Sequence, residues 1–144
     1  MLVIIRGIPG SGKSTLAKST KNFIHYEADM FFIDENNEYK YDPNKIKQAH
    51  EWCKNKVFSR LKEDNNVVVS NTFIQPWELK PYFEFCFEYG IDISVVDLLT
   101  EYNNIHNVPS QVIDRMKRNF RPLYTIPELF KQVVTYVCHK RSGE

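Results

Sequence analysis

A glycine-rich loop near the amino terminus constrains this chain more than any other feature of its sequence. The loop, Gly7-Ile-Pro-Gly10-Ser-Gly12-Lys13-Ser14, fits the pattern G-x-x-x-x-G-K-[ST]. It follows residues 2–5, a short β-branched run typical of a buried parallel strand, and it opens a helix predicted at about residues 13–21. A strand, a glycine loop and a helix in immediate succession indicate an α/β fold.

The spacing of this loop suits it to binding phosphate. Its glycines let the backbone curl so that successive N–H groups point at phosphate oxygens, and the helix that follows adds the positive end of its dipole. Lys13 is placed for the β- and γ-phosphates, with a predicted catalytic role, and the Ser14 hydroxyl is placed for Mg²⁺. The predicted nucleotide-binding residues of the loop are Gly7, Pro9, Gly10, Ser11, Gly12, Lys13, Ser14 and Thr15.

The rest of the chain alternates strands with helices. Further strands are predicted at residues 23–27, 67–69 and 91–99, and further helices at 43–61, 76–89 and 110–121. The capping-box spacing of Thr125 and Glu128, followed by apolar residues up to Val137, predicts a last helix at about residues 125–140. This order predicts a three-layer P-loop fold with a mainly parallel sheet. We expect one domain over residues 1–144, with its core at about 1–120, because 144 residues is an ordinary domain length.

Composition excludes several classes of protein. The formal charge of +1 argues against a generally basic nucleic-acid coat protein, although residues 115–144 carry seven basic and two acidic groups. Three scattered cysteines with no C-x-x-C pair argue against a disulfide framework or a zinc site and favour a reducing compartment. No long apolar run is present, so we predict a cytoplasmic protein that does not enter membranes.

Three aspartates are candidates for a second acidic group near the phosphates. Asp34 ends an apolar run but begins a polar loop, and Asp97 follows Val95-Val96 at a strand end. Asp29 comes just after the second predicted strand, where the sheet would bring it beside the transferred phosphate. Asp29 is therefore the preferred candidate.

Several blocks of this sequence resemble the kinase domain of phage polynucleotide kinases and the small ATP-binding relatives of that domain. The resemblance extends from Met1 to about Phe120. The blocks that carry it are Arg6-Gly-Ile-Pro-Gly-Ser-Gly-Lys-Ser-Thr15, Ala28-Asp29, Glu38-Tyr-Lys-Tyr-Asp-Pro43, Ala49-His-Glu-Trp-Cys53, Asn71-Thr72, Gln75-Pro-Trp-Glu-Leu-Lys-Pro-Tyr82, Asn107-Val-Pro109 and Arg115-Met116.

This resemblance implies transfer of the ATP γ-phosphate to a hydroxyl, typically the 5′-hydroxyl of a single-stranded polynucleotide, with Mg²⁺ as cofactor. Asp29 matches the residue that accepts the hydroxyl proton in that family, a role that suits a carboxylate. The matched blocks also make His50, Asn71 and Thr72 candidates for the acceptor site.

The chain departs from the family pattern in three places. Asn71 stands where the family has an aspartate, and Phe32 stands where the polynucleotide kinases have an arginine for the acceptor strand. The family also has a lid with arginines, whereas residues 100–106 contain no Arg or Lys, and Tyr102 and Asn103 hold the arginine positions. Arg118, with its basic neighbours Arg115, Lys117 and Arg121, is the predicted substitute at the nucleotide.

These departures leave three functions open. The leading interpretation is an ATP-dependent kinase that acts on a polynucleotide 5′-hydroxyl or a similar acceptor. The second is a nucleotide-binding regulatory module with little turnover, because an arginine at the transferred phosphate contributes orders of magnitude in rate. The third is a kinase for a small metabolite or nucleoside. The oligomeric state is not predicted.

Overall fold

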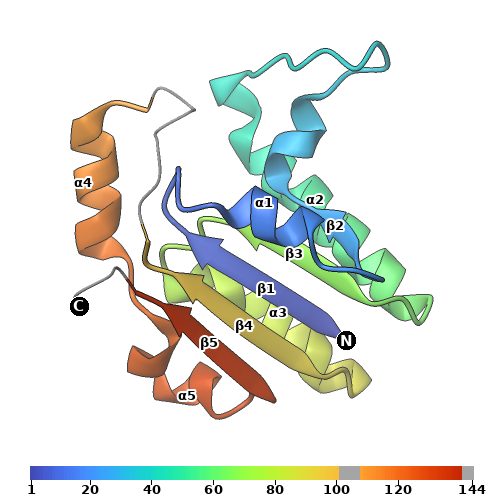
Figure 1. Cartoon of the computed structure of the whole chain (residues 1–144). Helices are drawn as coiled ribbons and strands as arrows, with labels where there is room; N and C mark the ends of the chain where they lie inside the picture. The colour runs from blue at the N-terminus through green and yellow to red at the C-terminus, as the bar shows by residue number, and fades with distance from the viewer. Residues whose placement is uncertain (101–107, 141–144) are drawn as a thin grey trace.

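The computed structural model describes residues 1–100 and 108–140, which form a parallel sheet with helices against both faces (Figure 1). The strands are β1 (Leu2–Gly7), β2 (Ile24–Tyr26), β3 (Val67–Asn71), β4 (Ile93–Leu98) and β5 (Thr135–His139). Their order across the sheet is β2-β3-β1-β4-β5, and every neighbouring pair is parallel. The predicted α/β fold is confirmed.

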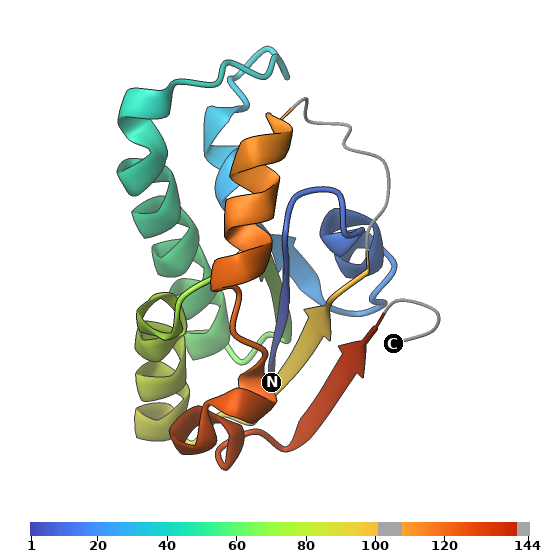
Figure 2. The same ribbon diagram turned by 90° about the vertical axis from the view of Figure 1, so that its left-hand side faces the viewer.

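The helices divide between the two faces of the sheet, which gives the three predicted layers (Figure 2). Helix α1 (Lys13–Lys18) packs on one face, where Ala17 joins a small apolar cluster with Ile5. Helices α2 (Ile46–Lys62) and α3 (Pro76–Tyr89) cover the other face. The chain continues through α4 (Ser110–Asn119) and the short α5 (Pro127–Phe130).

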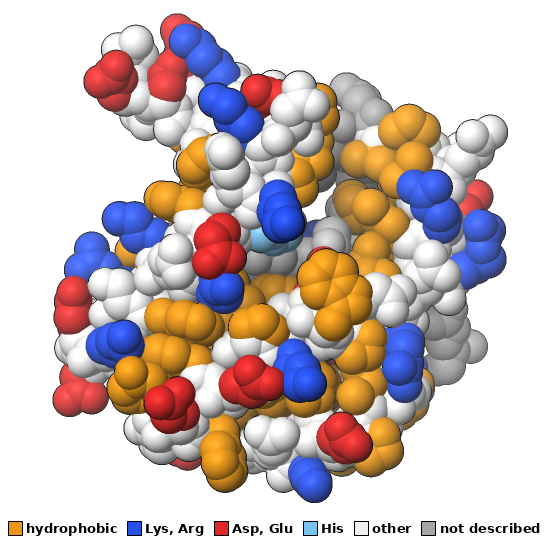
Figure 3. Space-filling model, turned by 180° about the vertical axis from the view of Figure 1, so that it is seen from behind, with side chains coloured by type: hydrophobic (Ala, Val, Ile, Leu, Met, Phe, Trp, Pro, Cys, Tyr) orange, Lys and Arg blue, Asp and Glu red, His pale blue; other side chains and the backbone are white. Residues whose placement is uncertain are grey.

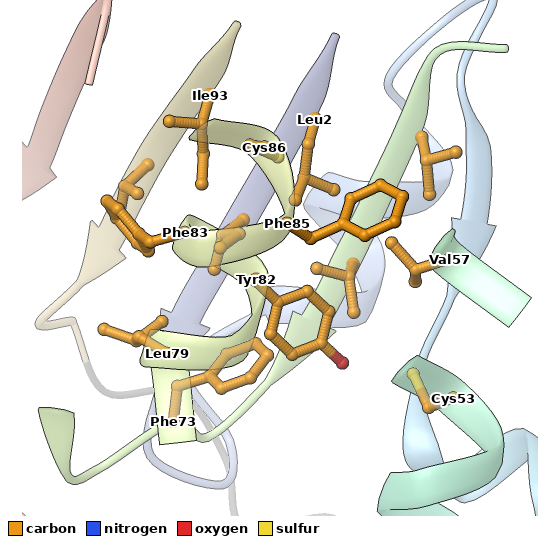
Figure 4. Close-up of a cluster of buried hydrophobic side chains, with 14 of the residues drawn as sticks. Leu2, Cys53, Val57, Phe73, Leu79, Tyr82, Phe83, Phe85, Cys86 and Ile93 are labelled. Atoms are coloured by element: carbon orange, nitrogen blue, oxygen red, sulfur yellow. The ribbon is translucent and has the colours of Figure 1, made fainter. Parts of the chain in front are cut away.

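The larger core lies between the sheet and helices α2 and α3 (Figure 4). Helix α2 buries one apolar face there, formed by Ala49, Cys53, Val57 and Leu61, with Cys53 and Val57 fully inaccessible to solvent. Phe83 and Leu79 of α3 pack against the same side of the sheet. Burying one such large apolar side chain contributes about 1.5–3 kcal/mol, so this face fixes where α2 and α3 lie.

The carboxyl-terminal segment differs from the prediction. The helix predicted at about residues 125–140 is wrong: α5 spans only Pro127–Phe130, and residues 135–139 form strand β5 beside β4. Threonine, tyrosine and valine favour extended backbone when an open sheet edge is available to pair with them. Pairing with the edge of β4 therefore makes residues 135–139 a strand, although the apolar residues from Leu129 to Val137 also fit a helical period.

The described residues also bear on the compositional expectations. All three cysteines are free, with Cys53 and Cys86 buried and Cys138 half-buried. Within residues 1–100 and 108–140, no helix is long and apolar enough to cross a membrane.

Candidate active site

The phosphate-binding loop joins the carboxyl end of β1 to the start of α1. Gly10 and Gly12 have φ angles of 85° and 92°, a left-handed conformation that favours glycine. At Gly7 the constraint is space, since a Cβ atom there would lie 2.4 Å from Ser11 Oγ and 2.9 Å from the carbonyl oxygen of Leu98. The conformation of the loop therefore requires glycine at positions 7, 10 and 12.

Lys13 and Ser14, the two loop residues with predicted roles at the phosphates and Mg²⁺, both make hydrogen bonds within the protein. Lys13 Nζ donates to the carbonyl oxygen of Ile8 at 3.1 Å. Burial lowers the pKa of the Lys13 ammonium to about 8, against the opposing effect of the negative charges of Glu27 and Asp29. Ser14 Oγ donates to Glu27 Oε2 at 2.6 Å. The loop therefore holds a lysine poised to gain an anionic partner, and a hydroxyl fixed by a carboxylate.

Glu27 is the site residue that sequence reasoning missed. It directly follows β2, and its Oε2 accepts from Ser14 and from Ser70 Oγ at 3.0 Å, with His25 Nε2 at 3.5 Å. Burial alone would raise the pKa of Glu27, but the contacts from His25, Ser14 and Ser70 together hold it at about 2. The only sequence indication was an acid at the end of a predicted strand, two residues before Asp29, and no motif contains it.

Asp29 lies in the short 3-10 helix η1 (Ala28–Phe32), which follows Glu27. Its side chain is exposed, and Asp29 Oδ1 accepts from the phenol of Tyr39 at 3.3 Å. Its charge acts on Lys13, so the structure brings this preferred acid to the same place as the phosphate-binding loop. Tyr39 in turn has its pKa raised to about 12 by burial and by Asp29, and so remains a neutral donor.

Asn71 links the end of β3 to the segment that carries Asp29. Its Oδ1 accepts from the backbone N–H of Ala28 at 2.9 Å, and its Nδ2 lies 3.7 Å from Cys53 Sγ. Because the side chain is buried, Asn71 fixes the start of η1. Thr72 follows it, half-buried, and His50 is exposed on α2. Of these three residues, Asn71 alone makes a hydrogen bond to the segment of Asp29 within the described part of the chain.

The other two aspartates have structural partners. Asp97 forms a fully buried ion pair with Arg6 at 2.8 Å and also accepts from the backbone N–H of Leu123. Asp34 pairs with Lys40 at 2.9 Å and accepts two backbone N–H groups of its own loop. Both carboxylates are therefore engaged in holding the fold, which leaves Glu27 and Asp29 as the acids beside the phosphate-binding loop.

Of the predicted basic groups, Arg115, Lys117 and Arg118 lie on α4, and Arg121 follows the end of that helix. Arg118 is exposed on α4, and Figure 3 shows the surface hollowed between α4 and the start of α2. Thr100, which begins the predicted lid, donates from Oγ1 to the carbonyl oxygen of Ser11 at 3.3 Å. The rest of that lid, including Tyr102 and Asn103, lies outside the described residues.

Comparison with known proteins identifies the family to which this chain belongs. Residues 2–123 match the family model described as "AAA domain", and the chain belongs to that family. Human NEDD4-binding protein 2 is 29% identical over 99% of this chain, which spans only 9% of that protein's length.

Two solved structures share the fold. A chain of the Pnkp1/Rnl/Hen1 RNA repair complex superposes with a TM-score of 0.65 and 22% identity, covering 88% of this chain and 45% of that one. The APS kinase CysC of Mycobacterium tuberculosis, in complex with AMPPNP and APS, gives a TM-score of 0.51 and 16% identity, covering 98% of this chain and 89% of that one. The fold is therefore that of a P-loop kinase.

Proposed function

We propose that this chain transfers the γ-phosphate of ATP to a hydroxyl, and that the acceptor is a polynucleotide 5′-hydroxyl. The observation that carries the proposal is that Lys13 and Ser14 lie beside the segment of Asp29. Ser14 Oγ donates to Glu27 Oε2 at 2.6 Å, and Asp29 follows Glu27 two residues later. Transfer to a hydroxyl needs a phosphate cradle, a counter-charge and a positioned proton acceptor. This edge of the sheet offers all three, and the resemblance to polynucleotide kinases supports the choice of acceptor.

Each residue takes a distinct part in the proposed transfer. The acceptor oxygen bonds to the γ-phosphorus while the bond from that phosphorus to the bridging oxygen breaks, and ADP leaves with the electron pair. Asp29 takes the proton of the hydroxyl, and Lys13 neutralises charge on the phosphates. Asn71 positions Asp29 through its hydrogen bond to Ala28.

The residues present also fit a magnesium ion. The Ser14 hydroxyl is an oxygen ligand of the kind Mg²⁺ prefers, and it lies beside the ionised Glu27. Bound there with the nucleotide, the ion would supply neutralisation of the phosphate charge. Ser11 Oγ is buried with no hydrogen-bond partner among the described residues, which supports the proposal that the loop closes around phosphate.

Two features of the acceptor side bear on the substrate. The exposed rings of Tyr39 and Tyr41 stack 6.4 Å apart beside Asp29, and exposed aromatic rings can stack on an unpaired base. Phe32 is an uncharged side chain buried against these two rings, so it cannot bind a phosphate of an acceptor strand as an arginine would. This second feature favours a small hydroxyl compound as the alternative acceptor. His50 and Thr72 remain proposed acceptor-site residues, and Arg118 a proposed nucleotide contact.

The test is transfer of label from γ-labelled ATP to an acceptor panel: single-stranded RNA and DNA with 5′-hydroxyl ends, nucleosides and small alcohols. We expect label on the oligonucleotides with the natural chain and none with Lys13→Ala or Asp29→Asn. Label on nucleosides alone would establish the small-molecule kinase instead. Tight ATP binding without transfer to any acceptor would contradict both and favour the regulatory module.

A further inference from the structure

The position next to the phosphate-binding loop that usually holds a metal lacks an acid in this chain. P-loop proteins hold Mg²⁺ with the loop hydroxyl and an aspartate at the end of a neighbouring strand. Here β3, which pairs with β1, ends in Ser70-Asn71, and neither is acidic. On the other side of β1, Asp97 of β4 is enclosed with Arg6 and accepts from Leu123 and Tyr136. Neither strand beside β1 can therefore supply the charge.

Glu27 brings a carboxylate to that place from one strand further out. Its Oε2 contacts Ser14 Oγ at 2.6 Å and Ser70 Oγ at 3.0 Å, so it bridges the loop and the strand end where an acid is missing. Its Oε1 makes no hydrogen bond to any described residue, and its side chain is 20% exposed. One carboxylate oxygen is thus committed to the protein, while the other can accept from water.

The contact with Ser14 also determines how that hydroxyl is oriented. A serine hydroxyl has one proton to donate and two lone pairs. Because the proton points at Glu27, the lone pairs point elsewhere and remain available to a cation. Within the described residues no cluster of three acidic, histidine or cysteine ligands exists.

We propose that Glu27 replaces the strand-end acid of the metal site, holding nucleotide-bound Mg²⁺ through the Ser14 hydroxyl and the water around the ion. This inference rests on the proposed function, since it concerns the ion that accompanies ATP. Glu27 is a positioning residue: it orients Ser14 and accepts from water, and it does not touch the acceptor hydroxyl.

The test measures binding of a non-hydrolysable ATP analogue by calorimetry, with Mg²⁺ titrated from none to excess. Glu27→Gln keeps the size of the side chain and removes its charge. We expect metal-free affinity at least equal to that of the natural chain, because a negative charge near the phosphates is lost. The Mg²⁺ concentration needed for half of the metal-dependent gain should rise about 10- to 100-fold, the range for outer-shell ligands.

Asp34→Asn is the matched control, because it removes an equal charge from a loop carboxylate that is paired with Lys40. It should leave the Mg²⁺ dependence unchanged. The double variant Glu27→Ser with Ser70→Asp moves the acid to β3. It should restore most of the Mg²⁺ dependence of ATP-analogue binding, since Ser70 Oγ lies 3.0 Å from Glu27 Oε2.

Three outcomes would overturn the inference. An unchanged Mg²⁺ dependence in Glu27→Gln would show that the charge is not used for the ion. An equal loss of affinity with and without Mg²⁺ would assign Glu27 a structural role only. If the natural chain bound the ATP analogue equally well with and without Mg²⁺, both the inference and the proposed Mg²⁺–ATP reaction would be overturned. This result differs from a failure of the inference alone, because it appears in the natural chain before any substitution.

Discussion

Raising the pH from 7 to 9 should weaken ATP binding through Lys13. Burial lowers the pKa of this ammonium from 10.5 to about 8 in the free protein. Triphosphate beside Lys13 would favour the charged form, so the pKa rises on binding and the protein takes up a proton. Affinity is therefore full below the free-state pKa and falls as the pH rises through it.

The expected change is large enough to measure. If Lys13 stays protonated in the complex, apparent affinity follows the protonated fraction of the free protein. With a pKa of about 8 this fraction falls from about nine-tenths at pH 7 to about one-tenth at pH 9. The affinity should thus fall about tenfold, or about 1.4 kcal/mol. A lysine at its ordinary pKa of 10.5 would give a change of only about 3% over the same range.

Calorimetry at pH 7, 8 and 9 in buffers of different ionisation enthalpy measures both the affinity and the protons taken up. About half a proton should be taken up at pH 8. Lys13→Met should bind weakly with no pH dependence in this range. Asp29→Asn should move the midpoint to lower pH, because the charge of Asp29 raises the pKa of Lys13. An affinity that is equal at pH 7 and 9, without proton uptake, would refute this account of Lys13.

Three further substitutions test the framework around the site. Asp97→Asn leaves the fully buried Arg6 without its ion partner, and urea denaturation should show a loss of about 3–5 kcal/mol; a loss below about 1 kcal/mol would contradict this role. Gly7→Ala places a Cβ atom 2.9 Å from a backbone carbonyl, so calorimetry should detect no ATP binding and thermal melting a lower midpoint; unchanged binding would count against it. Asn71→Ala removes the acceptor of the Ala28 N–H, so labelled-phosphate transfer should slow while ATP affinity is kept; equal losses in both would argue for a role in nucleotide binding instead.

The predictions that succeeded from sequence depend on local rules. The loop from Gly7 to Ser14 is specified by glycine conformation and by its position between a strand and a helix. In α2 the side chains of Ala49, Cys53, Val57 and Leu61 recur at the helical period and are buried on one face, whereas Ile46 in the first turn is exposed. These features need no knowledge of which strands become neighbours.

Other features depend on the order of the strands in the sheet. Glu27 reaches Ser14 and Ser70 only because β2 lies beside β3, and β3 beside β1. The segment of residues 135–139 is a strand because the edge of β4 is open to it. The apolar residues from Leu129 to Val137 also fit a helical period, so pairing with β4 rather than local preference makes residues 135–139 a strand.

The sequence by itself determined the phosphate-binding loop, the alternation of strands and helices, and Asp29 as the preferred acid. Only the tertiary structure decided which carboxylates have other partners, because Arg6 encloses Asp97 and Lys40 pairs with Asp34. It also placed Glu27 against the loop hydroxyl. The physical reason is range: backbone conformation and periodicity act over a few residues, whereas the partner of a charge is set by which distant strands lie side by side.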